Sequence, residues 1–184
     1  HQEDTLVSID SIPKGHNGYL SALNAQRVLF IPSPVAHLTF SKMNNQEANI
    51  ILSVLRDLHT LYGSQSVSLS KKTIGIITPF RSQIINIRHH LQQLDFELDC
   101  VIDTVERFQG GACDIIIISM VVSNPDQMQM ICSGGEGIDR KMNVALTRAR
   151  ERLIMVGNPE ILSLSPFYKS FIDEYGIAPD ISIE

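Results

Sequence analysis

Hydrophobic residues along the chain follow two spacings, and each spacing predicts a different kind of element. Continuous apolar runs predict strands over residues 28–31, 73–78, 98–102, 114–122 and 153–156. Apolar positions three or four residues apart predict helices over residues 44–63, after Pro79, over 140–150 and in short pieces within 158–175. Asn44 followed by Glu47 resembles a capping box at a helix start. Residues 1–27 and 123–139 show neither spacing, so we predict loops there.

The order of these elements predicts an α/β fold. Strands and helices alternate along most of the chain, which favours a mostly parallel sheet with helices on both faces. The run over residues 114–122 is apolar at nearly every position, as expected for a strand that is covered on both faces. Ligands of such sheets bind beyond the carboxyl ends of the strands. We therefore look for chemistry in residues 78–83, in residues 103–111 and in the helix that starts at Arg140.

Composition and charge narrow the class of protein. The 184 residues suit one domain, and 43% hydrophobic with 19% charged residues is ordinary for a globular protein. No apolar run is long enough for a membrane span, and the first ten residues lack the features of a signal peptide. The net charge of −5 argues against tight nucleic-acid binding by this chain alone. Three cysteines without a CxxC pair predict no metal site and indicate an intracellular location, cytoplasmic in a bacterium.

Three segments carry candidate chemistry. Thr78, Arg81 and Gln83 come at a predicted helix start, which suits an anion, although a proline-terminated strand and an exposed helix start explain them equally. A turn over residues 104–108 leads to Gln109, Gly110 and Gly111, whose backbone N–H groups suit phosphate oxygens; a tight turn that needs glycine is the other interpretation.

The predicted helix over residues 140–150 separates two arginines. At about 100° per residue, Arg148 and Arg150 point roughly 160° apart, so at most one of them can face a phosphate. A solvated polar face is the alternative for both. The chain has no GxxxxGK[ST] segment and hence no phosphate-binding P-loop.

Three segments together resemble one family. IGIITPFRSQ, VIDTVERFQGGACDIIIISMVVSN and RKMNVALTRARERLIMVGNP are similar to motifs IV, V and VI of superfamily 1B helicases, in the group of the nonsense-mediated RNA decay helicase and its DNA-repair relatives. The resemblance covers residues 28–160. It implies a RecA-like, P-loop NTPase-type three-layer sandwich: residues 28–184 would be the second RecA-like domain, without the P-loop domain, and residues 1–27 an irregular N-terminal segment of it.

The resemblance also implies roles for individual residues. In this family two RecA-like domains clamp ATP and Mg²⁺, which the first domain mainly binds, and the second supplies an arginine finger and half of the track for single-stranded DNA or RNA. Arg148 would be the catalytic finger. The other implied sites are nucleotide contacts at Gln109, Gly110 and Arg81, and nucleic-acid contacts at Thr78, Pro79, Thr104 and Asn143. This interpretation requires that Arg148 is not locked in an internal ion pair and faces an open edge of the sheet.

The chain departs from the family pattern in two places. Ala112 stands where motif V usually has a nucleotide-holding glutamate, and residues 1–27 lack the arginine-bearing segment that normally precedes motif IV. We expect the chain alone to be inactive as an ATPase. We expect it to act together with the N-terminal RecA-like domain of the same protein, and we expect no membrane association. A degenerate, non-catalytic helicase-like module for protein or nucleic-acid interaction is the alternative function. An unrelated α/β phosphate-binding enzyme is less favoured, because no Gly-rich turn follows the first strand.

Overall fold

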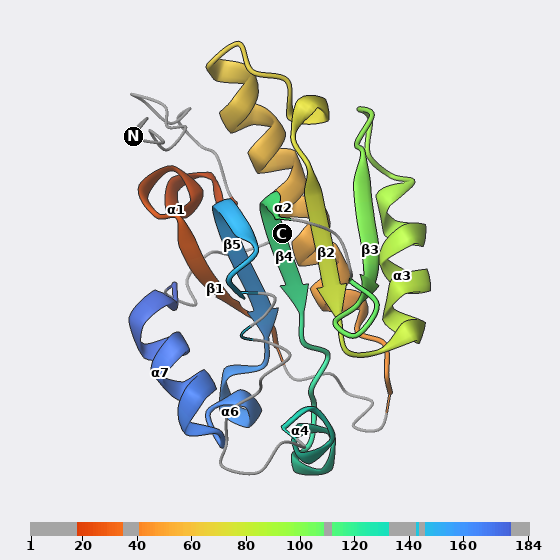
Figure 1. Cartoon of the computed structure of the whole chain (residues 1–184), viewed down its shortest axis with the longest axis vertical. Coiled ribbons are helices and arrows are strands. Elements are labelled where there is room, and N and C mark those ends of the chain that lie inside the picture. Colours follow the sequence, from red (N-terminus) through yellow and green to blue (C-terminus); the bar gives the residue numbers. More distant parts are fainter. Residues whose placement is uncertain (1–17, 35–40, 109–111, 133–142, 144–145, 178–184) are drawn as a thin grey trace.

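A computed structural model describes residues 18–34, 41–108, 112–132, 143 and 146–177. Its centre is a sheet of five parallel strands in the order β1–β5–β4–β2–β3 (Figure 1). The strands are β1 (Val28–Pro32), β2 (Ile74–Thr78), β3 (Cys100–Thr104), β4 (Cys113–Ser119) and β5 (Ala149–Gly157). All carboxyl ends therefore meet at one edge of the sheet, and all amino ends meet at the opposite edge. The predicted mostly parallel α/β sheet is confirmed.

Helices cover both faces of this sheet (Figure 1). On one face lie α1 (Leu20–Ala25), α2 (Asn45–Ser64) and α3 (Arg81–Leu91); on the other lie α4 (Pro125–Ile131), α6 (Pro159–Leu162) and α7 (Pro166–Tyr175). A short 3₁₀ turn, η1 (Leu69–Lys71), precedes β2. The arrangement is the three-layer sandwich expected of a RecA-like fold.

Strand β4 shows why the sheet has two cores. Successive side chains of a strand point to opposite faces. Ile115 and Ile117 pack with the α1–α2–α3 layer, while Ile116 and Ile118 pack with the α4–α6–α7 layer, and all four are fully buried. The apolar run that the sequence shows at these positions is thus the requirement of a strand with no solvent-facing side.

The helix predicted over residues 44–63 is confirmed as α2, but only the N-cap half of the predicted capping box forms, because the backbone N–H of Asn44 donates to Gln83 and not to Glu47. The Asn44 side chain accepts hydrogen bonds from the backbone N–H groups of Gln46 and Glu47, at 2.9 and 3.1 Å. The Asn44 amide in turn lies 3.4 Å from the Glu47 carboxylate. The helix start is therefore fixed by side chains of the sequence pattern that predicted it.

Two segments predicted to be loops contain helices. Within residues 1–27, α1 forms because Leu20 and Leu23 are fully buried against the sheet layer. Within residues 123–139, Asn124 caps α4 by accepting from the Gln127 N–H at 2.9 Å, and Pro125 begins the helix. Both helices are shorter than eight residues, so their apolar spacing is too brief to stand out in the sequence.

The predicted helix over residues 140–150 is wrong at its end. Asn143 and Leu146 are helical, but Thr147 and Arg148 form a turn and Arg150 lies in β5, which pairs with β4 along its length. Pairing in the sheet outweighs the helical spacing, and it places the charged Arg152 opposite Ile115. The strand predicted over 114–122 likewise stops early, at Ser119, because Val121 has a φ of 57°.

Candidate functional site

The predicted site residues fall on two opposite edges of the sheet. Thr78 and Thr104 end β2 and β3 and are directly paired, so they lie side by side at the carboxyl edge. Arg148 immediately precedes β5, and its carbonyl accepts the Cys113 N–H at 3.0 Å at the start of β4. Strand β4 is seven residues long, so the two edges are about 20 Å apart. The expectation that all candidate residues gather beyond the carboxyl ends is therefore wrong for Arg148.

The connection from β3 to β4 explains this separation. Because β3 and β4 run parallel, the chain between them must cross from the carboxyl edge to the amino edge. It leaves Thr104 in the predicted turn, where the Thr104 carbonyl accepts the N–H groups of Arg107 and Phe108 at 3.0 and 2.8 Å. Phe108 is then buried against Gly75, where an added Cβ would lie 2.4 Å from its ring. Motif V therefore begins at one edge and ends at the other.

Arg148 makes hydrogen bonds to residues before and after the glycine-bearing part of this connection. Its half-buried side chain donates from Nη1 to the carbonyl of Phe108, and its own carbonyl accepts from Cys113. Gln109, Gly110 and Gly111 lie outside the described residues, but Phe108 before them and Cys113 after them are both bonded to Arg148. The structure thus brings the segments predicted as motifs V and VI together at the amino edge.

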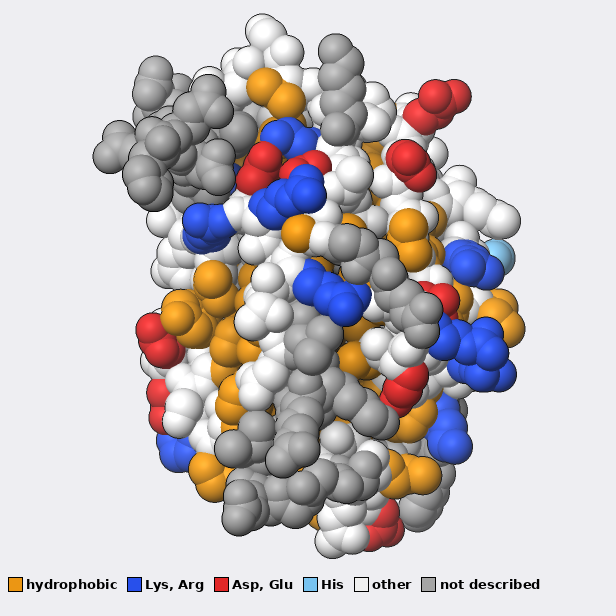
Figure 2. Space-filling model, viewed as in Figure 1, with side chains coloured by type: hydrophobic (Ala, Val, Ile, Leu, Met, Phe, Trp, Pro, Cys, Tyr) orange, Lys and Arg blue, Asp and Glu red, His pale blue; other side chains and the backbone are white. Residues whose placement is uncertain are grey.

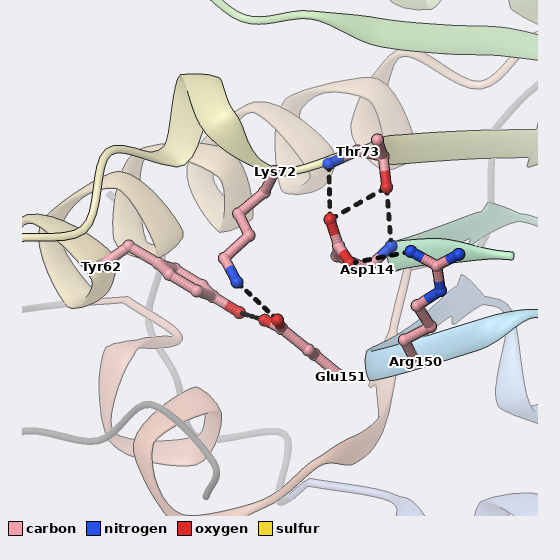
Figure 3. A network of polar contacts seen from close by, with 6 residues as sticks. All are labelled: Tyr62, Lys72, Thr73, Asp114, Arg150 and Glu151. Atoms are coloured by element: carbon pink, nitrogen blue, oxygen red, sulfur yellow. Dashed lines mark hydrogen bonds and ion pairs between the residues drawn. The ribbon is translucent and has the colours of Figure 1, made fainter. Parts of the chain in front are cut away.

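Arg150 takes a different partner. Its side chain is 58% exposed, and Nη1 lies 3.6 Å from Oδ1 of Asp114 (Figure 3). The two arginines do point to different partners as expected, although the reason is the geometry of a turn and a strand rather than that of a helix. Asp114 also accepts from the N–H and Oγ1 of Thr73 at 2.8 and 2.9 Å. Burial raises the pKa of the Asp114 carboxyl, but these bonds, Lys72 and Arg150 outweigh it, and the pKa lies below its ordinary value.

A second polar cluster lies beside this one (Figure 3). Glu151 of β5 accepts from the Tyr62 hydroxyl at 2.7 Å and from the Lys72 ammonium. Arg152, the residue after Glu151 in β5, is 1% exposed and donates to the carbonyls of Leu23 and Gln26. Charged residues of β5 thereby tie α1 and α2 to the amino edge, next to Arg148.

At the carboxyl edge, three of the predicted contact residues are buried, and one of them, Gln83, is held by hydrogen bonds within the protein. Gln83 is fully buried: its Oε1 accepts the Asn44 N–H at 2.9 Å, and its Nε2 donates to the Asn44 carbonyl and to Ser119 Oγ. Gln83 therefore does not contribute to an anion site at the start of α3. Thr78 is also fully buried, with no hydrogen bond to its Oγ1, and Thr104 is 6% exposed.

The remaining predicted contacts divide between the edges. Arg81 is exposed at the first position of α3, next to the half-buried Pro79, and so belongs to the carboxyl edge. Asn143 is half-buried in the segment that leads to Arg148. Its carbonyl accepts a hydrogen bond from the backbone N–H of Thr147 at 3.1 Å. The structure thus separates Arg81, at the carboxyl edge, from Arg148, at the amino edge, although the resemblance placed both at the nucleotide.

Sequence reasoning missed the second role of Glu47. The residue is fully buried beneath the carboxyl edge, where its carboxylate accepts from Ser119 Oγ at 2.7 Å, from the Val121 N–H at 3.0 Å and from Ser33 Oγ at 3.3 Å. Burial raises the pKa of this carboxyl to about 7, although the hydrogen bonds act to lower it. A glutamate directly before the apolar series of a helix was the available signal.

Among the described residues, no three His, Cys, Asp or Glu side chains are grouped so that they could hold a metal ion. None of the described helices combines the length and apolar character that crossing a membrane requires.

Known proteins resemble this chain over most of its length. Residues 31–160 match the model of a family described as an AAA domain. RNA helicase Mov10l1 of Homo sapiens is 38% identical over 128 residues, which cover 68% of this chain and 10% of that protein. Regulator of nonsense transcripts 1 of Dictyostelium discoideum is 38% identical over 146 residues, covering 73% of the chain and 10% of that protein. DNA polymerase alpha-associated DNA helicase A of Saccharomyces cerevisiae is 33% identical over 122 residues, covering 66% and 16%. The chain thus spans only 10–16% of the length of these relatives.

Proposed function

Since the chain belongs to the AAA-domain family and is a C-terminal RecA-like domain of the superfamily 1B helicase type, we propose that it is one half of an ATP-driven motor on single-stranded nucleic acid. Its amino edge would face the nucleotide and its carboxyl edge the nucleic acid. A second RecA-like domain of the same protein would hold ATP and Mg²⁺ against the amino edge. The relatives include one protein named as an RNA helicase and one named as a DNA helicase, so the proposal covers single-stranded RNA and single-stranded DNA.

The observation that carries this proposal is the position of Arg148 at the amino edge. One residue bonds both ends of the glycine-bearing segment, through its side chain to Phe108 and through its carbonyl to Cys113. A phosphate that approached the backbone N–H groups of such a segment would therefore meet a guanidinium beside it. A phosphate is a stronger acceptor than the Phe108 carbonyl, because the hydrogen bond to it is charge-assisted.

Arg148 would then act as an arginine finger. Phosphoryl transfer spreads negative charge over the transferred group, and a fixed guanidinium stabilises that charge. Because the guanidinium stands on a different domain from the phosphate-binding lysine, hydrolysis would depend on closure of the two domains. Ala112 is exposed next to this segment in place of the family's glutamate, so the nucleotide would be held with one carboxylate fewer.

The test is the substitution Arg148→Ala in the full-length protein. Loss of one charge-stabilising group should lower the ATPase kcat by about 100- to 1,000-fold. The matched control is Arg150→Ala, two residues along the chain, whose exposed side chain pairs with Asp114 at 3.6 Å. It should retain a kcat near that of the wild type. Near-normal turnover of Arg148→Ala, or an equal loss in the control, would contradict the finger assignment.

The alternative of a non-catalytic interaction module is favoured by Ala112 and by the net charge of −5. It predicts that neither arginine substitution changes any ATP turnover of the full-length protein. The same pair of variants therefore separates the two functions.

A further inference from the structure

The exposed face of α3 carries an unusual stripe of side chains. Arg81, Ile85 and Arg88 are spaced by four and three residues, so they lie within about 60° of one another on the helix. Both arginines are exposed, and Ile85 is 71% exposed between them. Among the described residues Ile85 is the most exposed large apolar side chain, and with an exposed arginine on either side it forms a candidate contact surface.

Positive charge predominates on the helix that carries this stripe, although Asp99 and Arg88 both lie near enough to the Cys100 thiol to influence its pKa. Helix α3 contains two arginines and two histidines but no acidic residue, while the whole chain has a net charge of −5. The nearest acidic residues along the chain, Asp95, Glu97 and Asp99, follow the helix rather than lying on it.

Three other cations of the chain are paired within it. Lys72 pairs with Glu151, Arg150 with Asp114, and Lys169 with Asp173. In the part of the chain that the structure describes, neither Arg81 nor Arg88 makes an ion pair. Their charge is therefore available to a partner of opposite sign.

The stripe also continues to the carboxyl edge. The Ser82 hydroxyl donates to the Lys42 carbonyl at 2.8 Å, which places exposed Lys42 beside the first turn of α3. The Lys42 ammonium lies 5.8 Å from the centre of the Phe80 ring. Figure 2 shows Lys and Arg side chains along the edge of the molecule that α3 occupies in Figure 1. A single strand of nucleic acid bound at the carboxyl edge could therefore continue along the positively charged face of α3.

We propose that the α3 stripe of Lys42, Arg81, Ile85 and Arg88 binds the phosphate backbone of the nucleic acid as it leaves the carboxyl edge. The inference rests on the proposed function and extends it to a surface outside the sheet edge. Arg81 and Arg88 are separated by about 10 Å along the helix axis, so they can contact different phosphates of one strand. Arg81 accordingly contacts nucleic acid, not the nucleotide, and Ile85 packs against the sugars between two phosphate contacts.

The experiment measures the salt dependence of binding by the full-length protein without nucleotide. The probes are fluorescein-labelled oligo-dT and oligo-U of equal length, titrated between about 50 and 200 mM salt. Each lost phosphate contact reduces the slope of log K against log salt by about 0.7 for a single strand. The double variant Arg81→Gln/Arg88→Gln should therefore bind more weakly at low salt, with a slope reduced by about 1.4.

Two further variants guard against a simple folding defect. Ile85→Lys adds a cation between the arginines and should raise both the low-salt affinity and the slope, by about 0.7. No loss of structure would strengthen binding in this way. Arg27→Gln/Lys169→Gln removes two exposed charges, one just before β1 and one on α7, and should keep the wild-type slope.

The outcomes separate this inference from the proposed function. A wild-type protein that binds neither probe overturns both. A wild type that binds, with the same slope and affinity in Arg81→Gln/Arg88→Gln, overturns the α3 stripe alone, as expected if the stripe served an acidic protein partner. A reduced slope in that variant, together with an increased slope in Ile85→Lys, supports it.

Discussion

At the scale of single residues, Glu47 shows how one buried carboxylate can organise an edge of the sheet. It caps its own helix through Asn44 and accepts hydrogen bonds from the ends of two strands, at Ser33 and Ser119. Its bond to the Val121 N–H also fixes a β-branched residue at a positive φ of 57°, a conformation that costs about 1–3 kcal/mol unless its surroundings hold it. The carboxyl ends of β1 and β4 are thereby held by the start of α2.

The buried Glu47 predicts a pH dependence of stability. Its pKa is about 7 in the folded protein against an ordinary value of 4.5, so the folded state holds the proton more tightly. The stability gained is fully present below about pH 4.5 and is lost as the pH rises through 7. Between about pH 5 and pH 8 the wild type should lose about 2 kcal/mol from this group. Glu47→Gln should lack that loss in urea unfolding at the two pH values.

The control for this prediction is Glu160→Gln, which removes an exposed carboxylate at the start of α6. It should follow the pH dependence of the wild type. A Glu47→Gln variant whose unfolding free energy runs parallel to that of the wild type from pH 5 to pH 8 would show that Glu47 does not titrate in this range.

At the scale of elements, β5 is held by charges that a strand does not usually contain. Arg152 is buried at 1% exposure, opposite Ile115 of β4, and its Nη1 donates to the carbonyls of Leu23 and Gln26 at the end of α1, while its Nε has no hydrogen-bond partner among the described residues. It also lies 5.9 Å from the centre of the Tyr62 ring in α2. One side chain thus joins β5 to two helices of the same layer.

We expect Arg152→Met to loosen α1. The substitution leaves the carbonyls of Leu23 and Gln26 without this donor, and the first of these bonds is buried, which should lower the free energy of unfolding by about 1–3 kcal/mol. Hydrogen exchange should quicken at the amides of Leu23 and Gln26, whose N–H groups donate within and just after α1. The control Arg150→Met removes an exposed ion pair and should change the stability by about 1 kcal/mol or less. An equal effect of the two substitutions would contradict the role given to Arg152.

The same strand shows where sequence reasoning stopped. Strands β1, β2 and β4 could be predicted because their apolar runs are the direct requirement of a doubly covered sheet. The start of β5 could not, since Arg150, Glu151 and Arg152 resemble a solvated helix face until their partners in α1, α2 and β4 are known. Helices α1 and α4 were missed because six or seven residues carry too little periodicity.

The candidate site was predictable by residue type but not by location. The motif strings identified Arg148 and Thr104 as candidates, and a parallel sheet suggested the carboxyl edge for both. Which edge a connecting segment reaches depends on where it crosses the sheet, and Phe108 packed against Gly75 decides this for motif V. The commitment of Gln83 to Asn44 and Ser119 likewise follows from tertiary packing that no local pattern contains.

At the scale of the whole molecule, the proposed function assigns the nucleotide to the amino edge of the sheet and the nucleic acid to its carboxyl edge. The amino edge holds Arg148 and the ends of the glycine-bearing segment, and the carboxyl edge holds Thr78 and Thr104 with α3 beside them. The sheet between them is about 20 Å deep, and its strand β2 is buried at every position. Such a layer would transmit a movement of the nucleotide edge to the nucleic-acid edge as a rigid body.

This division predicts that the 184-residue chain alone is a poor ATPase. Its sequence contains no phosphate-binding GxxxxGK[ST] segment, so it can offer a finger but not the main nucleotide grip. The purified chain, shown to be folded by circular dichroism, should give negligible ATP turnover with Mg²⁺ and oligo-dT or oligo-U. Substantial turnover that stays with the chain through successive purification steps would contradict the prediction.

The most direct measurement compares the affinity of the full-length protein for ADP and for ADP with aluminium fluoride, in the wild type and in Arg148→Ala. A group that stabilises only the transition state should matter for the transition-state analogue and not for the product. We predict that Arg148→Ala leaves ADP affinity unchanged and weakens binding of the analogue by about 100- to 1,000-fold. Equal affinities for the analogue in the two proteins would show that Arg148 does not reach the transferred phosphate.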